Sequence, residues 1–101
     1  MTHHQELADG RWFIMTIAEQ LGNVGSEYSR ASNSLKQNNQ VRFKAAQERF
    51  LELLNLTIID PRWSVFRKRE LLRLREICCE DFPDNLQIYF DQFALLARKN
   101  K

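Results

Sequence analysis

Arginine and lysine side chains gather in one stretch of the chain, and their type and spacing best suit binding chemistry. The stretch contains Arg62, Arg67-Lys68-Arg69, Arg73 and Arg75. On a helix Arg69 and Arg73 share a face because residues four apart are neighbours, and Arg62 lies near the start of that face. Guanidinium groups arranged in this way neutralise phosphates. Arg62, Arg69 and Arg73 are therefore candidate contacts for RNA or a nucleotide.

Acidic residues interrupt this basic stretch and give a simpler interpretation. Glu70, Glu76 and Glu80 alternate with the arginines, and Glu76 follows Arg73 by three residues. Ion pairs at that spacing reduce the local potential, and the formal net charge of the chain is only +2. A solvated helix face explains the stretch as well as phosphate binding does, so nucleic acid is the alternative partner. Trp63 and Phe66 beside the arginines resemble a stacking platform for bases, but we expect them to fill the end of the core.

Glu27 and Arg30 form a second candidate binding site, three residues apart and beside the apolar seam of the first helical segment. One interpretation is an ion pair between helices, in which Arg30 meets Glu48 or Glu52. The other is a polar pocket beside the small residues Gly22, Gly25 and Ser29, which leave room for a ligand. The small residues are equally typical of close helix packing. An enzyme built on the edge of Glu27, Arg30 and Glu52 is the third hypothesis.

Several kinds of catalysis are excluded by the residues that are missing. The only histidines are His3 and His4, at the head of the chain. Di-iron centres need Glu-x-x-His pairs, and hydrolytic triads need a histidine base. Cys78 and Cys79 are adjacent and cannot bridge, and they do not make a zinc motif. We therefore expect no catalytic residues, no cofactor and no metal, in a protein of the reducing cytoplasm.

Apolar residues recur in steps of three and four, which predicts an all-α protein. The 101 residues make one domain with few turns, since only three Gly and two Pro are present. Four helical segments are expected, at 11–37, 40–59, 61 or 64 to 82, and 85–98, between a flexible head (1–10) and a flexible tail (99–101). Short loops then give an antiparallel up-down-up-down four-helix bundle.

The length of the first segment and the breadth of the second favour self-association. The first helix exceeds the fourth in length, so it either breaks near Gly22 and Gly25 or extends onto a second chain. The second segment is apolar on more than one side and would lie in the interface of a homodimer. Phe66, Ile77 and Leu96 are expected in the core of the third and fourth helices. No stretch has the length of a signal peptide or membrane span. The chain is thus expected to be a non-enzymatic helical interaction module.

Four strings of residues resemble a set of short, all-helical bacterial proteins to which no activity is assigned. They are Arg11-Trp12-Phe13, the stretch 25–31, the stretch 50–62 with its Asp60-Pro61-Arg62, and the stretch 70–76. The resemblance implies a bacterial cytoplasmic protein. More distantly, the layout is similar to the HEPN-like helical partners of minimal nucleotidyltransferases. Their Arg-to-His motif is absent here, so the resemblance implies at most a degenerate partner without the catalytic histidine.

Overall fold

The protein is built from four α-helices preceded by one short turn of 3-10 helix. The computed structural model describes residues 10–80, 82–83 and 85–99. The elements are η1 (Arg11–Ile14), α2 (Ile17–Lys36), α3 (Gln40–Ile59), α4 (Val65–Glu80) and α5 (Gln87–Lys99). Within these ranges no residue belongs to a strand. The predicted all-α four-helix bundle is confirmed.

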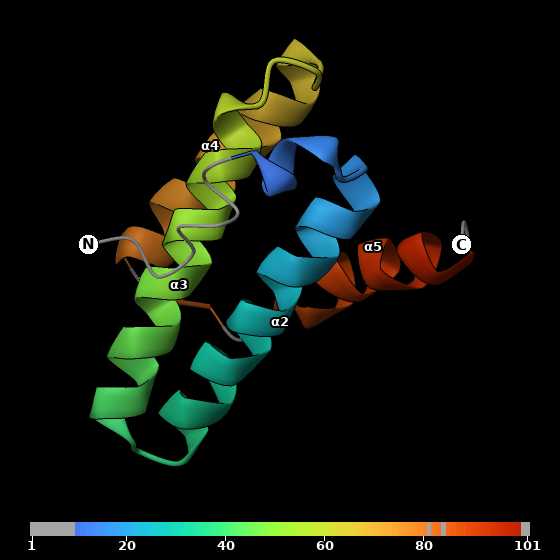
Figure 1. Cartoon of the computed structure of the whole chain (residues 1–101). Helices are drawn as coiled ribbons and strands as arrows, with labels where there is room; N and C mark the ends of the chain where they lie inside the picture. The colour runs from blue at the N-terminus through green and yellow to red at the C-terminus, as the bar shows by residue number, and fades with distance from the viewer. Residues whose placement is uncertain (1–9, 81, 84, 100–101) are drawn as a thin grey trace.

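Helices α2 and α3 form an antiparallel hairpin on which the other two helices are placed (Figure 1). The turn between them passes through Asn38, whose φ of 56° lies in the left-handed region that asparagine tolerates. Asn39 then caps α3, because its side chain accepts the backbone N–H of Arg42. Helix α4 packs on α3, and α5 crosses α2. Side chains join α4 to α5, since the guanidinium of Arg67 lies 5.2 Å from the centre of the Phe93 ring.

The first helix begins later than the apolar pattern predicts. Thr16 accepts the backbone N–H of Glu19 at 3.1 Å, and the Glu19 carboxylate accepts the backbone N–H of Thr16 at 3.0 Å. This capping box satisfies two N–H groups that a longer helix would need to satisfy elsewhere. Helix α2 therefore starts at Ile17 and has 20 residues, the same number as α3. Helix α2 still exceeds α5, which has 13 residues, but the mismatch is smaller than the sequence predicts, and α2 runs unbroken through Gly22 and Gly25.

The third and fourth helices also begin slightly later than the predicted starts, which are at 61 or 64 and at 85. Asp60 ends α3, and α4 starts only at Val65, after Ser64 accepts the backbone N–H of Arg67. Helix α5 begins at Gln87. The predicted capping residue Asp84 lies outside the described residues.

The core is an aromatic cluster between α2, α3 and α5. Tyr28, Phe50 and Phe90 are buried and pack ring against ring, with centres 5.4 to 6.0 Å apart. The Tyr28 hydroxyl donates to the Pro83 carbonyl at 2.6 Å and accepts the backbone N–H of Leu86 at 3.1 Å. One phenol on α2 thus holds the connection between α4 and α5. Trp12, from η1, is also fully buried in this core.

The broad apolar surface of α3 is used within the chain. Phe50, Leu53 and Leu54 are buried, and the helix packs against both α2 and α4. The second helix is therefore covered on two sides, as its sequence predicts, but by α4 rather than by a second chain. The breadth of the apolar surface of α3 therefore does not require an interface with a second chain.

Candidate functional site

A groove, here called the α4 groove, runs along α4 beside the segment that enters α5. It has a volume of about 560 Å³. Its α4 residues lie at i, i+3, i+4, i+7, i+8 and i+11, the spacing of one helix face. Leu86 completes it from the α5 side. The α4 residues of the groove are Phe66, Arg69, Glu70, Arg73, Leu74 and Ile77.

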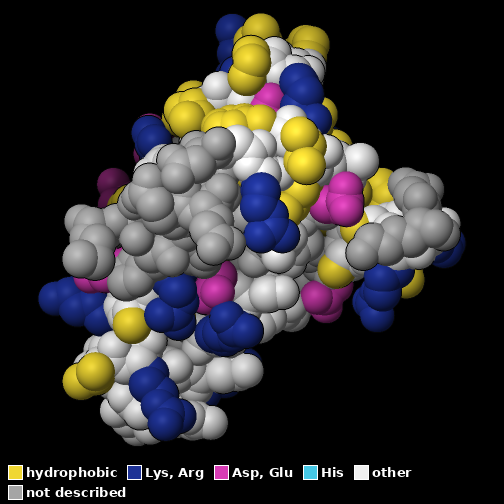
Figure 2. Space-filling view, viewed as in Figure 1, with side chains coloured by type: hydrophobic (Ala, Val, Ile, Leu, Met, Phe, Trp, Pro, Cys, Tyr) yellow, Lys and Arg dark blue, Asp and Glu magenta, His cyan; other side chains and the backbone are white. Residues whose placement is uncertain are grey.

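Two large apolar side chains of this groove face water. Phe66 is 83% exposed and Ile77 is 52% exposed, so their predicted place in the core is wrong. Helix α4 instead buries Leu71, Leu74 and Cys78, at i, i+3 and i+7, so that Leu74 lies where the groove meets the core. Figure 2 shows apolar side chains gathered at the end of the molecule where α3 ends and α4 begins. Exposed apolar side chains beside a groove are typical of interaction surfaces.

The predicted core position of Leu96 is wrong as well. Its side chain is 47% exposed, because α5 turns the Phe90 side toward the core and leaves Leu96 outside.

The groove carries charges of both signs. Arg69 and Arg73 lie in it, and the structure forms no ion pair to either from the described residues. The Glu70 carboxylate has two partners within its own chain. Arg67 donates to it at 2.9 Å, and the Tyr89 hydroxyl donates to the same oxygen. Burial raises the pKa of Tyr89, and the Glu70 carboxylate raises it further. The ion pairing with glutamate that the sequence predicts for the basic stretch is therefore present at Arg67.

Arg62 does not belong to this groove, although the sequence grouped it with Arg69 and Arg73. Its guanidinium binds the fully buried Asp60 carboxylate, with Nε 3.0 Å from Oδ1 and NH2 2.7 Å from Oδ2. The same NH2 also donates to the Met15 carbonyl at 2.7 Å. The proposed three-arginine contact with phosphate thus loses one of its members.

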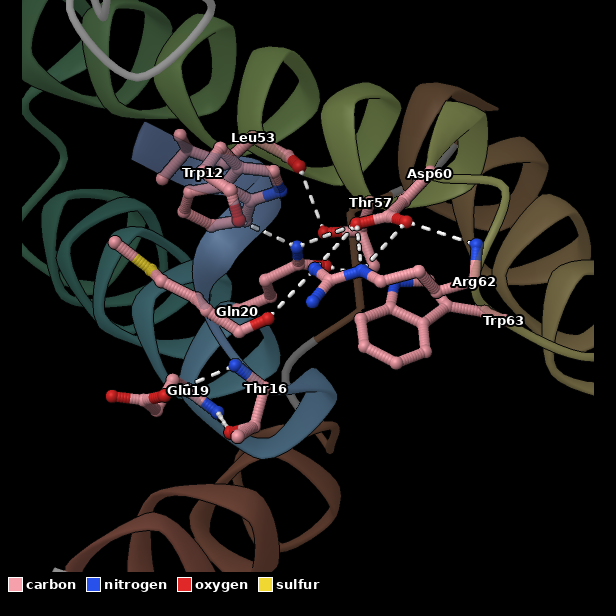
Figure 3. A network of polar contacts seen from close by, with 10 residues as sticks. Trp12, Thr16, Glu19, Gln20, Leu53, Thr57, Asp60, Arg62 and Trp63 are labelled. Carbon is pink, nitrogen blue, oxygen red and sulfur yellow. Dashed lines mark hydrogen bonds and ion pairs between the residues drawn. The ribbon is translucent and has the colours of Figure 1, made fainter. Parts of the chain in front are cut away.

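Asp60 is the centre of a polar network that joins three parts of the chain (Figure 3). The Gln20 amide donates to Asp60 at 3.0 Å and to the Trp12 carbonyl at 2.8 Å, and its oxygen accepts the Trp63 indole N–H at 2.9 Å. The guanidinium of Arg62 lies 4.3 Å from the centre of the Trp63 ring. The network fastens η1 and α2 to the corner between α3 and α4.

The chemistry of this network is structural. Hydrogen bonds from Arg62 lower the pKa of Asp60 to about 2, although burial acts in the opposite direction. A carboxylate with that pKa stays ionised near neutral pH and is poorly matched to general acid–base catalysis. The indole N–H of Trp12 is the one buried side-chain donor without a partner in the described part of the chain.

Glu27 and Arg30 do form an ion pair, but within one helix. The Glu27 carboxylate, 6% exposed, accepts Arg30 at 2.8 Å and Arg49 of α3 at 3.0 Å. The interhelical ion pair predicted at this edge is therefore present with different partners, because Arg49 rather than Arg30 crosses between the helices. Glu52 lies one turn further along α3 and is half-buried.

The stripe of small residues serves helix packing. A Cβ at Gly25 would lie 2.5 Å from the Phe90 Cβ, and one at Gly22 would lie 3.3 Å from the Ala94 Cα. Ser29 donates to the Gln87 side chain. Helix α5 packs directly on the stripe at Gly25. A pocket of about 370 Å³ does reach Gly22, but Asn23, Ser26 and Arg98 line it rather than Glu27 and Arg30.

The remaining reactive groups are two thiols. Cys78 is buried and Cys79 is exposed, both unpaired, and burial raises the pKa of Cys78 to about 12. The described residues contain no group of three His, Cys, Asp or Glu side chains that could hold a metal ion. None of their helices combines the length and the apolar character needed to cross a bilayer. His3 and His4 lie outside the described residues.

Comparison with protein-family models, with curated proteins and with solved structures finds no match for this chain. The resemblance to short bacterial proteins stays a prediction.

Sequence reasoning missed Gln20 and Arg49. Gln20 directly precedes the buried Leu21 on α2. Its amide both donates and accepts hydrogen bonds, so its position next to a core residue was a signal for a buried network. Arg49 lies next to the buried Phe50 and three residues before Glu52. Its contact with Glu27 depends on the register of the α2–α3 hairpin, which the apolar pattern alone does not give.

Proposed function

We propose that the protein is a non-enzymatic helical module that binds a second copy of itself through the α4 groove. The observation that carries the proposal is the exposure of Phe66 and Ile77 on the rim of one groove. Removing such side chains from water favours association. The setting implied by the resemblance, a bacterial cytoplasm, suits a chain with two unpaired thiols.

The charges on α4 are complementary to those of a second α4 in antiparallel orientation. A two-fold axis between the levels of Leu71 and Leu72 places Phe66 opposite Ile77 of the second copy. The same axis places Glu70 opposite Arg73 of the second copy. Two-fold interfaces repeat each contact, so the pairing joins two apolar contacts with two opposite-charge contacts.

The expected dimer is weak. Helix α4 has 16 residues and is about 24 Å long at the usual rise. A stable complex buries roughly 800 Å² on each partner, which one helix face does not reach. We expect a dissociation constant on the order of tens of micromolar.

A nucleic-acid partner is the alternative that the sequence left open. Arg69 and Arg73 remain available for phosphate, but Arg62 is bound to Asp60 and the groove also holds Glu70. Apolar rim residues favour a protein surface over a phosphate backbone, whose binding is dominated by basic side chains.

Sedimentation equilibrium of the purified chain tests the proposal. Phe66→Asp and Ile77→Asp should abolish the dimer without loss of helix content, because both side chains are exposed in the monomer. Val41→Asp is the matched control, since Val41 is 83% exposed on α3 and away from the groove. It should leave the dimer unchanged.

A wild-type chain that stays monomeric at millimolar concentration would refute self-association. In that case RNA binding is measured at two salt concentrations. A salt-dependent affinity that is lost in the Arg69→Ala/Arg73→Ala variant would establish the nucleic-acid alternative in its place.

A further inference from the structure

A second cavity lies between the C-terminal half of α2 and the N-terminal half of α3, apart from the α4 groove. It has a volume of about 470 Å³. Helix α2 lines it with Arg30, Asn33 and Ser34, at i, i+3 and i+4, and its C-cap residue Gln37 continues this row. The matching row on α3 begins with Arg42 and ends with Arg49. Two antiparallel helices thus turn a polar row on α2 and a row that begins and ends with arginine on α3 toward the same space.

The cavity is strongly positive. Three guanidinium groups line it, from Arg30, Arg42 and Arg49, and no carboxylate of the described residues does. Glu27, beneath it, pairs with Arg30 and Arg49, and no described carboxylate pairs with Arg42. Three positive charges against one negative charge leave two that are uncompensated.

Two of the three arginines are oriented before any ligand arrives. The Glu27 side chain is only 7% exposed, and its two ion pairs fix the guanidinium groups of Arg49, itself 30% exposed, and of the more exposed Arg30. A guanidinium fixed in this way loses less conformational entropy when it binds an anion. The α3 row also contains Ala45 and Ala46, whose small side chains leave the space open.

We propose that this cavity binds the phosphate of a small phosphomonoester in its dianionic form. Arginine presents paired N–H donors that match phosphate oxygens, and a dianion balances the two uncompensated charges. The side-chain amides of Asn33 and Gln37 supply N–H donors for the oxygens that the arginines leave free. The site does not depend on self-association, since none of its residues lies on α4.

Phenyl phosphate, titrated at constant ionic strength and followed by amide NMR shifts, tests the site. We expect saturable binding with shifts centred on the facing halves of α2 and α3. Binding should weaken when the pH falls below about 6, where the ester takes up its second proton. Phenyl sulfate, a monoanion of similar shape, should bind more weakly at neutral pH.

Three variants distinguish phosphate binding in this cavity from non-specific attraction to positively charged side chains. Arg42→Gln should weaken binding at least tenfold, the usual effect of losing a charge-assisted contact, and Ala45→Leu should weaken it by filling the cavity. Lys44→Gln removes the same charge from an exposed position of α3 outside the cavity and should leave the affinity unchanged. Equal losses in Arg42→Gln and Lys44→Gln, or shifts that do not saturate, would overturn the proposal.

Discussion

The Asp60 carboxylate binds the guanidinium of Arg62, only two residues later in the chain, and does so while fully buried. The backbone N–H of Arg62 donates to the same carboxylate at 3.0 Å. The pair thus closes a tight local loop around Pro61. Through Gln20 it also reaches α2, so one carboxylate sets the corner between α3 and α4 and ties it to the start of the fold.

Asp60→Asn should destabilise the protein by about 2 kcal/mol. Breaking a buried ion pair costs roughly 3–5 kcal/mol, and the loss is smaller here because the Arg62 side chain is 38% exposed. Urea unfolding followed by circular dichroism measures the change. Asp91→Asn, at an exposed carboxylate on α5, is the control and should cost little.

The contribution of Asp60 to stability depends on pH with a definite sign. Its pKa is lowered in the folded protein from 3.8 to about 2. A lowered pKa means that the stabilisation is complete above the unfolded pKa and is lost as the pH falls through the folded one. The stability difference between the wild type and Asp60→Asn should therefore be constant above about pH 5 and shrink between about pH 4 and 2. A difference that grows as the pH falls would contradict this origin.

Gly25→Ala should destabilise the protein by about 1–3 kcal/mol, the usual cost of overpacking. The new methyl group would lie 2.5 Å from the Phe90 Cβ, an atom fixed to the α5 backbone. Helix α5 would have to move, which outweighs the gain of about 1 kcal/mol in helix propensity. Thermal unfolding measures the effect. Gly22→Ala meets only a 3.3 Å contact with Ala94 and should change stability less than Gly25→Ala does.

Arg73→Glu should weaken the proposed dimer at least tenfold. The substitution sets a carboxylate opposite Glu70 of the second copy, and two-fold symmetry applies the repulsion twice. Sedimentation at moderate salt measures it. Lys44→Glu makes the same change of charge on α3, outside the groove, and should leave the dimer intact. Equal weakening in both variants would show that net charge, rather than the α4 pairing, controls association.

The two neighbouring thiols should differ in reactivity by at least about a hundredfold. Cys79 is exposed, whereas burial raises the pKa of Cys78 to about 12, so almost no Cys78 thiolate exists near pH 8. Iodoacetamide labelling with mass spectrometry measures the difference. The Cys79→Ser variant should be labelled only as it unfolds, and rapid labelling of that variant in buffer would contradict the buried placement of Cys78.

The helices could be predicted because their periodicity is local, and α3 was found at its observed bounds between Asn39 and Asp60. The start of α2 was missed because apolar residues before Thr16 continue the helical spacing. The capping signature of Thr16 and Glu19, which begins that helix, is present in the sequence, but the apolar pattern extends past it. Local capping chemistry decided the boundary against the longer apolar pattern.

The face that α4 buries could not be read from its sequence. Phe66, Leu71, Leu74 and Ile77 lie on several sides of that helix, so only its contact with α3 decides which become core. The burial of Asp60 in a network with Gln20 could not be read for a related reason. Gln20 lies 40 positions from Asp60, and no spacing rule joins residues so far apart.

Trp12 fills the core from a single turn that precedes the first α-helix, and it has no exposed surface. The chain has two tryptophans, Trp12 and Trp63. In a Trp63→Phe variant, a short-wavelength fluorescence emission would therefore report that the Trp12 indole is packed in the core. A chain trimmed to begin at Thr16 would lose this indole and leave an unfilled volume in the core.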